Sequence, residues 1–89
     1  EFILSKQLLR SGTSIGANIA EANGGISQAD FSAKMSIAHK ECLETKYLLS
    51  LLKDTDYLEN KAFESVYEDA DEVAKMLFSI VKTSRKTDN

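Results

Sequence analysis

Proline is absent from this sequence of 89 residues, and glycine occurs only four times. Both residues are typical of turn-rich β folds, so their scarcity beside a 43% share of hydrophobic residues favours a few long helices. Cysteine occurs once, at Cys42, which excludes an internal disulfide framework and is typical of a reducing compartment. We therefore expect an all-α protein of the cytoplasm.

Long apolar runs are also missing. No stretch approaches the roughly 20 apolar residues that a membrane-spanning helix needs, and no secretory signal begins the chain, so we expect no membrane partner. The length suits one domain over residues 1–89 rather than a multidomain enzyme. Because the first residue is Glu1 and not Met, we expect the sequence to be part of a longer chain.

The net charge is low and negative. Eleven Lys and Arg residues stand against fourteen Asp and Glu residues, which gives a formal charge of -3. A protein that binds nucleic acid without sequence preference usually carries an excess of positive charge. The overall charge therefore argues against a general affinity for nucleic acid.

The apolar pattern predicts a first helix over residues 2–23. Its stripe has helical spacing, with the small Ser11 and Gly12 in one gap, and consists of Leu4, Leu8, Ile15 and Ile19. The helix should stop at Gly24-Gly25, since glycine is common just past a helix end. We expect the rest of the chain to pack against this first helix.

Small residues recur at every fourth position of the same helix, at Gly12, Gly16 and Ala20. Glycine inside a helix costs about 1 kcal/mol relative to alanine. Such a cost usually has a packing reason, and small residues at this spacing let another helix backbone come close. We expect a close helix contact at this strip.

A second helix is predicted over residues 27–54, and Ser27 to Asp30 resembles the capping box that begins a helix. Its apolar stripe advances by alternating steps of four and three residues, and Ile37, Leu48 and Leu51 widen it. The stripe consists of Phe31, Met35, Ala38, Cys42, Thr45, Leu49 and Leu52.

A third helix is predicted over residues 58–82, with Thr55, Asp56 and Asn60 as competing cap residues. Its stripe shows the same alternation and consists of Phe63, Val66, Ala70, Val73, Leu77 and Ile80. Residues 83–89 are polar, and we expect a mobile tail.

Three long helices with short turns should be antiparallel neighbours in an up-and-down bundle. Wide apolar faces are buried most efficiently by four helices. A fourth helix would therefore precede Glu1 or come from another subunit, and we expect the 89-residue chain not to be a stable monomer alone.

Two blocks of sequence carry a family resemblance. The first comprises Arg10, Ser14-Ile15 and Asn18-Ile19-Ala20-Glu21, and the second comprises Asp30-Phe31, Ile37-Ala38, Lys40-Glu41, Glu44-Thr45 and the leucine-rich residues 48–52. The sequence resembles the four-helix-bundle proteins related to the 23S rRNA intervening-sequence protein. It departs from them in having Gly16 where many members have proline, and in lacking their first helix.

This resemblance implies an antiparallel four-helix subunit that forms a ring-like homopentamer without enzymatic activity. A related protein is the accessory factor of diversity-generating retroelements, which looks like a basic partner of a reverse transcriptase and nucleic acid. The resemblance also implies a set of signature or packing residues: Arg10, Gly12, Ser14, Gly16, Asn18, Ala20, Glu21 and Glu44.

Polar groups of the first helix have two interpretations. Arg10 could pair with Glu41 or Glu44 on the next helix, and with Asn18 and Glu21 it could fix the register of the helices. The alternative is a ligand site. We favour the structural interpretation and predict an ion pair between Arg10 and a glutamate of the second helix.

No catalytic, metal or cofactor site is predicted. His39 and Cys42 lie three residues apart, but the chain has no second His or Cys to complete a metal site. Ser36 stands where the Glu-x-x-His motif of di-iron bundles needs a glutamate. Gly24-Gly25 is explained as a helix stop rather than as a phosphate loop.

Basic residues form two groups, which are the candidate nucleic-acid contacts. One recurs at seven-residue intervals along the second helix and the other lies at the end of the third: His39, Lys46 and Lys53, and Lys82, Arg85 and Lys86. Either these are solvated faces, or a fivefold assembly repeats them into a ring of positive charge that binds RNA or DNA. An acidic run opposes the second interpretation: Glu64, Glu68, Asp69, Asp71 and Glu72.

The sequence therefore favours a non-enzymatic protein that assembles with copies of itself. The alternative is an accessory module that binds nucleic acid through repeated basic patches.

Overall fold

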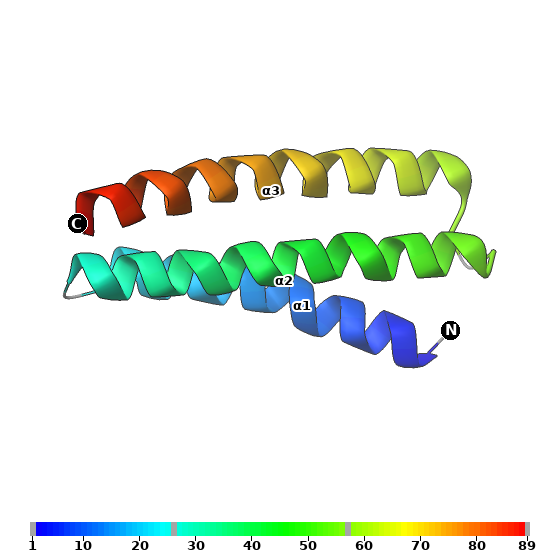
Figure 1. Cartoon of the computed structure of the whole chain (residues 1–89). Coiled ribbons are helices and arrows are strands. Elements are labelled where there is room, and N and C mark those ends of the chain that lie inside the picture. Colours follow the sequence, from blue (N-terminus) through cyan, green and yellow to red (C-terminus); the bar gives the residue numbers. More distant parts are fainter. Residues whose placement is uncertain (1, 26, 57, 89) are drawn as a thin grey trace.

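The computed structural model describes the backbone of residues 2–25, 27–56 and 58–88, and the side chains as far as Arg85. These residues form three helices and no strand: α1 (Phe2–Asn23), α2 (Gln28–Asp54) and α3 (Asn60–Asp88). Figure 1 shows neighbouring helices running antiparallel, with the first turns of α1 diverging from α2. The all-α class and the antiparallel arrangement are as predicted.

Local hydrogen bonds explain where α2 begins and ends. The Ser27 side chain accepts from the backbone N–H of Asp30 at 3.0 Å, which satisfies a donor that the helix itself leaves unpaired. At the other end, the N–H of Thr55 donates to the Leu51 carbonyl. Asp56 follows with a φ of 63°, a left-handed conformation that Asp tolerates better than most residues and that ends the helix.

The second helix, and not the first, is the centre of the molecule. α2 packs against both α1 and α3, whereas no described Cα atom of α1 comes within 8 Å of one in α3. The chain measures 46 × 20 × 14 Å along its principal axes. The helices therefore form a flat layer, and the expectation that the chain is organised around its first helix is wrong.

The core follows the stripe predicted for α2. Met35, Ala38, Cys42, Leu49 and Leu52 are buried, and Phe31 is half-buried against the same cluster. The neighbouring helices add the rest of this cluster, namely Ala22, Ala74, Leu77 and Val81, with Ile15, Ile19 and Val73 packed at its edge.

Buried hydroxyl groups join α2 to each neighbour. The Ser11 and Thr45 hydroxyl oxygens lie 2.9 Å apart between α1 and α2. Between α2 and α3, the Ser84 hydroxyl donates to the Ser32 hydroxyl oxygen at 3.1 Å. Ser11 thus belongs to the buried face of α1 rather than to a gap in it.

The apolar stripe predicted for α3 is correct in part, since Leu77 is buried and Val73 packs against the core. Val66 and Ile80 are exposed, whereas Ala74 and Val81 are buried. The predicted stripe and the observed buried stripe both include Leu77. This is possible because α3 carries apolar residues over a wide arc and can turn either edge of that arc toward α2. The edge that remains uncovered becomes part of an open surface.

The third helix extends into the tail predicted over residues 83–89, whose mobility stays a prediction. α3 continues to Asp88, and it begins at Asn60 rather than at residue 58. Ser84 is buried against α2, and the Arg85 guanidinium donates to the Ser36 hydroxyl oxygen at 3.3 Å. These polar contacts hold the last described turns on α2 although their composition is polar.

Candidate interaction surfaces

Arg10 bridges α1 to α2 as predicted. Its Nη2 lies 2.6 Å from a carboxylate oxygen of Glu44 and 3.2 Å from one of Glu41, while its Nε donates to the Gln7 side chain. Hydrogen bonds to Glu44 and Glu41 raise the pKa of Arg10, and the Arg10 guanidinium lowers the pKa of Glu44. The contact therefore favours the charged forms of Arg10 and Glu44, and both side chains are partly exposed.

Two other residues of the signature, Asn18 and Glu21, differ in the contacts that they make. The Asn18 amide donates to the Ser14 carbonyl and hydroxyl oxygens within α1, at 2.8 and 3.1 Å. It therefore does not make the contact between helices that the sequence predicted. Glu21 does connect two helices, since its carboxylate lies 3.0 Å from the Lys34 ammonium.

The strip of Gly12, Gly16 and Ala20 is open. A Cβ atom added at Gly12 or Gly16 would meet nothing within 4 Å, and Ala20 is exposed. The predicted close approach is therefore not made by any described helix of this chain. What remains is the prediction that a further helix approaches there.

The basic residues His39, Lys46 and Lys53 share one face of α2, but that face is turned toward α3. The His39 ring lies 5.8 Å from the Phe78 ring, centroid to centroid. The Lys46 ammonium is 2.8 Å from Asp71, and the Lys53 ammonium lies 4.8 Å from the centre of the Phe63 ring. His39 and Lys46 thus contact α3, and Lys53 is exposed beside Phe63, so their role as nucleic-acid contacts stays a prediction.

Asp71 lies between two lysines. One carboxylate oxygen is 2.8 Å from the Lys46 ammonium, and the other is 3.1 Å from the Lys75 ammonium. Hydrogen bonds from Lys46 and then Lys75 hold the pKa of Asp71 below its usual range, and the bond to Asp71 raises the pKa of Lys46. The cluster thus favours the charged form of both groups and offers no proton donor or acceptor near neutral pH.

We expect this cluster to make stability fall in acid. A carboxyl group whose pKa is lower in the folded state stabilises the fold above its unfolded pKa, about 4 for Asp, and this contribution is lost as pH falls through the lower folded value. Asp71→Asn should therefore lower the melting temperature at pH 7 and leave it closer to wild type at pH 2. Thermal melts across this range check it, with Asp69→Asn, an exposed neighbour, as control. Equal losses at both pH values would contradict the ion-pair role.

The second basic group is more accessible. Lys82 and Arg85 are exposed on the last turns of α3, while the side chain of Lys86 lies outside the described residues. One nitrogen of the Arg85 guanidinium donates a hydrogen bond to the Ser36 hydroxyl oxygen. Lys82 thus offers the freer charge of the two.

Cys42 and His39 do not form a metal site. The Cys42 thiol donates to the Ala70 carbonyl at 3.2 Å, and burial raises the pKa of this thiol. No group of three or more His, Cys, Asp or Glu residues within the described parts of the chain could hold a metal ion. A buried thiol with a raised pKa is a poor nucleophile.

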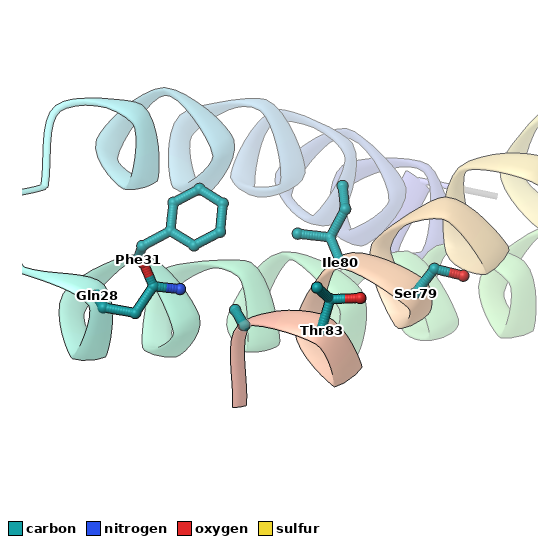
Figure 2. A pocket seen from close by; sticks show the side chains of 6 residues that line it. Gln28, Phe31, Ser79, Ile80 and Thr83 are labelled. Carbon is teal, nitrogen blue, oxygen red and sulfur yellow. The ribbon is translucent and has the colours of Figure 1, made fainter. Parts of the chain in front are cut away.

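α1 and α3 both pack on α2 without meeting each other, and we call the space along α2 between them the groove. Near one end it deepens into a hollow of about 330 Å³, lined by Gln28, Phe31, Ser79, Ile80, Thr83 and Ser84. Figure 2 shows Phe31 from α2 and Ile80 from α3 projecting to the same side. The lining has no Asp, Glu, Lys, Arg, His or Cys side chain, so it suits apolar contact and not acid–base chemistry.

A second hollow, of about 360 Å³, lies between α2 and α3 and includes the Asp71 cluster, Leu43 and Phe78 in its lining. Its charged groups are already paired, as described above. Elsewhere on its surface, α2 carries exposed apolar residues that the sequence pattern assigned to packing or did not single out; together with Leu43 these are Ile37 and Tyr47. Each of them lies one or two residues after a buried residue of α2, and this position in the sequence could have identified them.

None of the helices that the structure describes is long and apolar enough to cross a lipid bilayer.

No curated protein matches the chain. Among solved structures, it is similar to a crystal structure of a protein of unknown function from the S23 ribosomal protein family of Bacteroides thetaiotaomicron VPI-5482. The two are 54% identical with a TM-score of 0.89, and the match covers 92% of this chain and 76% of that one. Residues 1–79 match the family described as 23S rRNA-intervening sequence protein. The chain therefore belongs to the 23S rRNA-intervening sequence protein family.

Proposed function

We propose that this protein is a non-enzymatic subunit that assembles with copies of itself, and that it functions through the surface of the resulting oligomer. The observation that carries this proposal is the distribution of apolar side chains. The molecule measures only 14 Å along its shortest principal axis, and it exposes large apolar residues of α2 and α3, among them Tyr47, Phe78 and Ile80. Monomeric proteins rarely leave such surfaces open.

The groove between α1 and α3 supports a fourth helix in the complete subunit. The apolar side chains beside it are only partly covered by the described residues: Ile15, Ile19 and Phe31 are partly buried, and Val66 and Ile80 are exposed. Gly12 and Gly16 lie beside it with open space where a Cβ atom would be, so a helix backbone could come close. The solved relative from Bacteroides thetaiotaomicron has about a quarter of its chain outside the match, which is room for one more helix.

The chemistry of the hollows supports a role without catalysis. Catalysis by acid and base groups needs a side chain whose pKa lies near the working pH. In the hollow between α2 and α3, Lys46 and Asp71 shift each other's pKa away from neutrality. His39 also lines this hollow, where its ring lies 5.8 Å from the Phe78 ring. In the groove, the hollow has no titratable lining. The resemblance to bundle proteins without enzymatic activity agrees with this.

Solution mass of the complete natural protein tests the proposal. We expect one oligomeric species in light scattering, and a mass of five chains would match the homopentamer that the family resemblance implies. Ile80→Glu, which adds a charge to the groove at a residue 37% exposed in the described layer, should lower the melting temperature by more than 10 °C, since burial of an unpaired charge costs several kcal/mol.

The matched control is Met76→Glu, which adds the same charge to α3 at a residue that is 59% exposed and lies outside the groove lining. It should change the melting temperature by only a few degrees. A wild-type protein that remains monomeric at millimolar concentration would overturn the assembly proposal. Equal losses of melting temperature in the two variants would contradict the proposal that a fourth helix covers the groove.

A nucleic-acid accessory role is the second candidate, and one observation favours it. The last part of α3 carries Lys75, Lys82 and Arg85, and no acidic residue lies between Lys75 and Arg85. Repetition in an oligomer would bring several such ends together and strengthen binding to a phosphate backbone.

We expect such binding to be salt-dependent. In this case Lys82→Glu should weaken a gel shift with structured RNA by several fold at 50 mM salt, because each phosphate contact adds to the salt-dependent term. Lys61→Glu, at an exposed residue of the opposite end of α3, is the control. Absence of any shift at 50 mM salt would discard this second candidate.

A further inference from the structure

α3 carries three cations and an exposed aromatic ring in one row. Steps of three, four and three residues place them on one side of the helix, over a length of about 15 Å. The members, which we call the outer row of α3, are Lys75, Phe78, Lys82 and Arg85. Phe78 is 56% exposed, and the side chain of Lys75 is 78% exposed. No acidic residue stands between Lys75 and Arg85 in the sequence, so no carboxylate of α3 interrupts this row.

The outer row lies on the side of α3 that is turned away from the groove. Ile80, which lines the hollow of the groove, follows Phe78 by two residues and therefore lies about 200° around the helix. The Phe78 ring lies instead beside α2, where its centroid is 5.8 Å from that of the His39 ring. Arg85 also reaches α2, through its hydrogen bond to Ser36. A fourth helix in the groove would thus leave the outer row open.

The hollow of about 360 Å³ between α2 and α3 lies beside this row. Lys75, Phe78 and Ser79 line it from α3, and His39 and Leu43 line it from α2. Its volume is within the range of clefts that bind small ligands or parts of larger ones. The lining combines two flat rings, an apolar side chain and an exposed ammonium group. This composition suits a flat aromatic group attached to a negative charge.

The electrostatics of the hollow also favour an anion. Asp71 is the one carboxylate of its lining, and it contacts two ammonium groups, those of Lys46 at 2.8 Å and Lys75 at 3.1 Å. One negative charge against two positive charges leaves one positive charge over. Lys82 adds a further charge beyond Phe78, since it is exposed on the same side of α3.

We propose that the outer row of α3 binds a single strand of nucleic acid, with one base stacked on the Phe78 ring in the hollow. The phosphates before and after this base lie against Lys75 on one side and against Lys82 and Arg85 on the other. Stacking of this kind accepts any base, since every base has a π face. The proposal rests on the nucleic-acid role given above as the second candidate, and it names the form of the nucleic acid and the residues that hold it.

The exposed ring favours a single strand over the other partners of a basic surface. In a duplex the bases stack on one another, so a duplex would use the cations and not Phe78. An acidic peptide has the same limitation, because its carboxylates pair with Lys and Arg and gain little from an aromatic face. A second copy of this chain that covered Phe78 would also bury the cations around it, which is costly unless each finds an anion. Phe78 is therefore assigned to a ligand rather than to the assembly.

Phe78→Trp in the complete protein is the first test, because the described sequence contains no tryptophan. A stacked base should quench its fluorescence. We expect quenching at 50 mM salt by oligothymidylate or oligouridylate of about twelve nucleotides, and the tighter of the two shows whether DNA or RNA is preferred. Met76→Trp is the matched control, since Met76 is 59% exposed but lies about 200° around α3 from Phe78. Neither oligonucleotide should quench it, and a polyglutamate peptide should quench neither variant.

The second test separates stacking from charge. Phe78→Leu keeps an apolar side chain and removes the π face, so it should weaken binding of the labelled oligonucleotide by about fivefold or more. Lys82→Gln should weaken binding and make it less dependent on salt, because a phosphate contact is lost. Lys61→Gln, at the opposite end of α3, should do neither. Light scattering should show the same mass for all three variants, since these residues lie outside the groove.

The outcomes separate this inference from the functions proposed above. Quenching confined to Phe78→Trp, together with weaker binding by Phe78→Leu, would support it. Binding that is unaffected by Phe78→Leu would overturn the stacked base and leave a nucleic-acid role that depends on charge alone. Equal quenching by polyglutamate, or a reduced mass of the Phe78→Leu assembly, would also overturn it, in favour of an acidic protein or of a contact between subunits. Absence of any binding at 50 mM salt would overturn both this inference and the second candidate, and would leave the assembly proposal standing.

Discussion

Replacement of Leu49 by alanine should lower the free energy of unfolding by about 3 kcal/mol, which corresponds to roughly 15 °C in melting temperature for a domain of this size. Leu49 is 2% exposed and belongs to the largest fully buried side chains of the chain. It lies on the central helix, so its loss leaves a cavity that neither neighbouring helix can collapse into without moving the other side chains of α2. Thermal and urea melts followed by circular dichroism check this.

Leu43→Ala is the matched control for the loss of Leu49. It removes the same atoms from the same helix, but Leu43 is exposed. We expect a change below about 1 kcal/mol, because little apolar area returns to water. Similar losses from the two variants would mean that the described layer does not represent the packing of α2 in solution.

Gly16→Leu should destabilise the complete protein by about 2 kcal/mol through overpacking, and should reduce the size of the assembly. The described helices leave open space at this residue, so the cost arises only if a fourth helix lies there. Without such a helix, the substitution would instead stabilise α1 by up to about 1 kcal/mol, because leucine is a better helix former than glycine. The sign of the change in melting temperature therefore tests whether the groove is covered.

Ala17→Leu provides the control for Gly16→Leu. Ala17 is exposed and lies about 100° around α1 from Gly16, away from the groove. It should change the melting temperature by no more than a few degrees. Destabilisation by Gly16→Leu in the absence of any effect at Ala17 would locate the fourth helix beside the glycine strip, whereas stabilisation by both would contradict its presence.

The central helix was the part of the fold that the sequence predicted best. Its cap at Ser27 and its core stripe from Phe31 to Leu52 agree with the structure. Both depend on local chemistry: a hydroxyl group at a helix start, and apolar residues at a spacing that only one face of a helix can present. The ion pair of Arg10 was predictable for a similar reason, since two glutamates a turn apart on α2 offered it partners.

The orientation of α3 was not predictable from its own residues. Two neighbouring stripes through Leu77 have similar apolar content, and the choice between them depends on what covers each. Within the described layer α3 turns Ala74 and Val81 toward α2, and this leaves Val66 and Ile80 uncovered. Tertiary packing therefore decides between options that the local pattern leaves equal.

The roles of the polar residues were also hard to predict, because their partners are on another helix. Lys46 and Lys53 look like a basic stripe in the sequence, but Asp71 and Phe63 of α3 lie against them. In the same way, the polar composition after Lys82 suggested a mobile tail, whereas the Ser84 hydroxyl donates a hydrogen bond to the Ser32 hydroxyl oxygen of α2. Spacing along one helix shows which residues share a face, and it does not show what that face meets.

The position of α2 between two helices that do not meet has a consequence for motion. Since the backbones of α1 and α3 are not in contact, either outer helix can detach while the other two keep their hairpin. Such partial opening exposes the amides of the detached helix and leaves those of α2 protected. In hydrogen-exchange experiments the amide protons of α2 should therefore be the last to exchange, and the first turns of α1, which diverge from α2 in Figure 1, should be among the first.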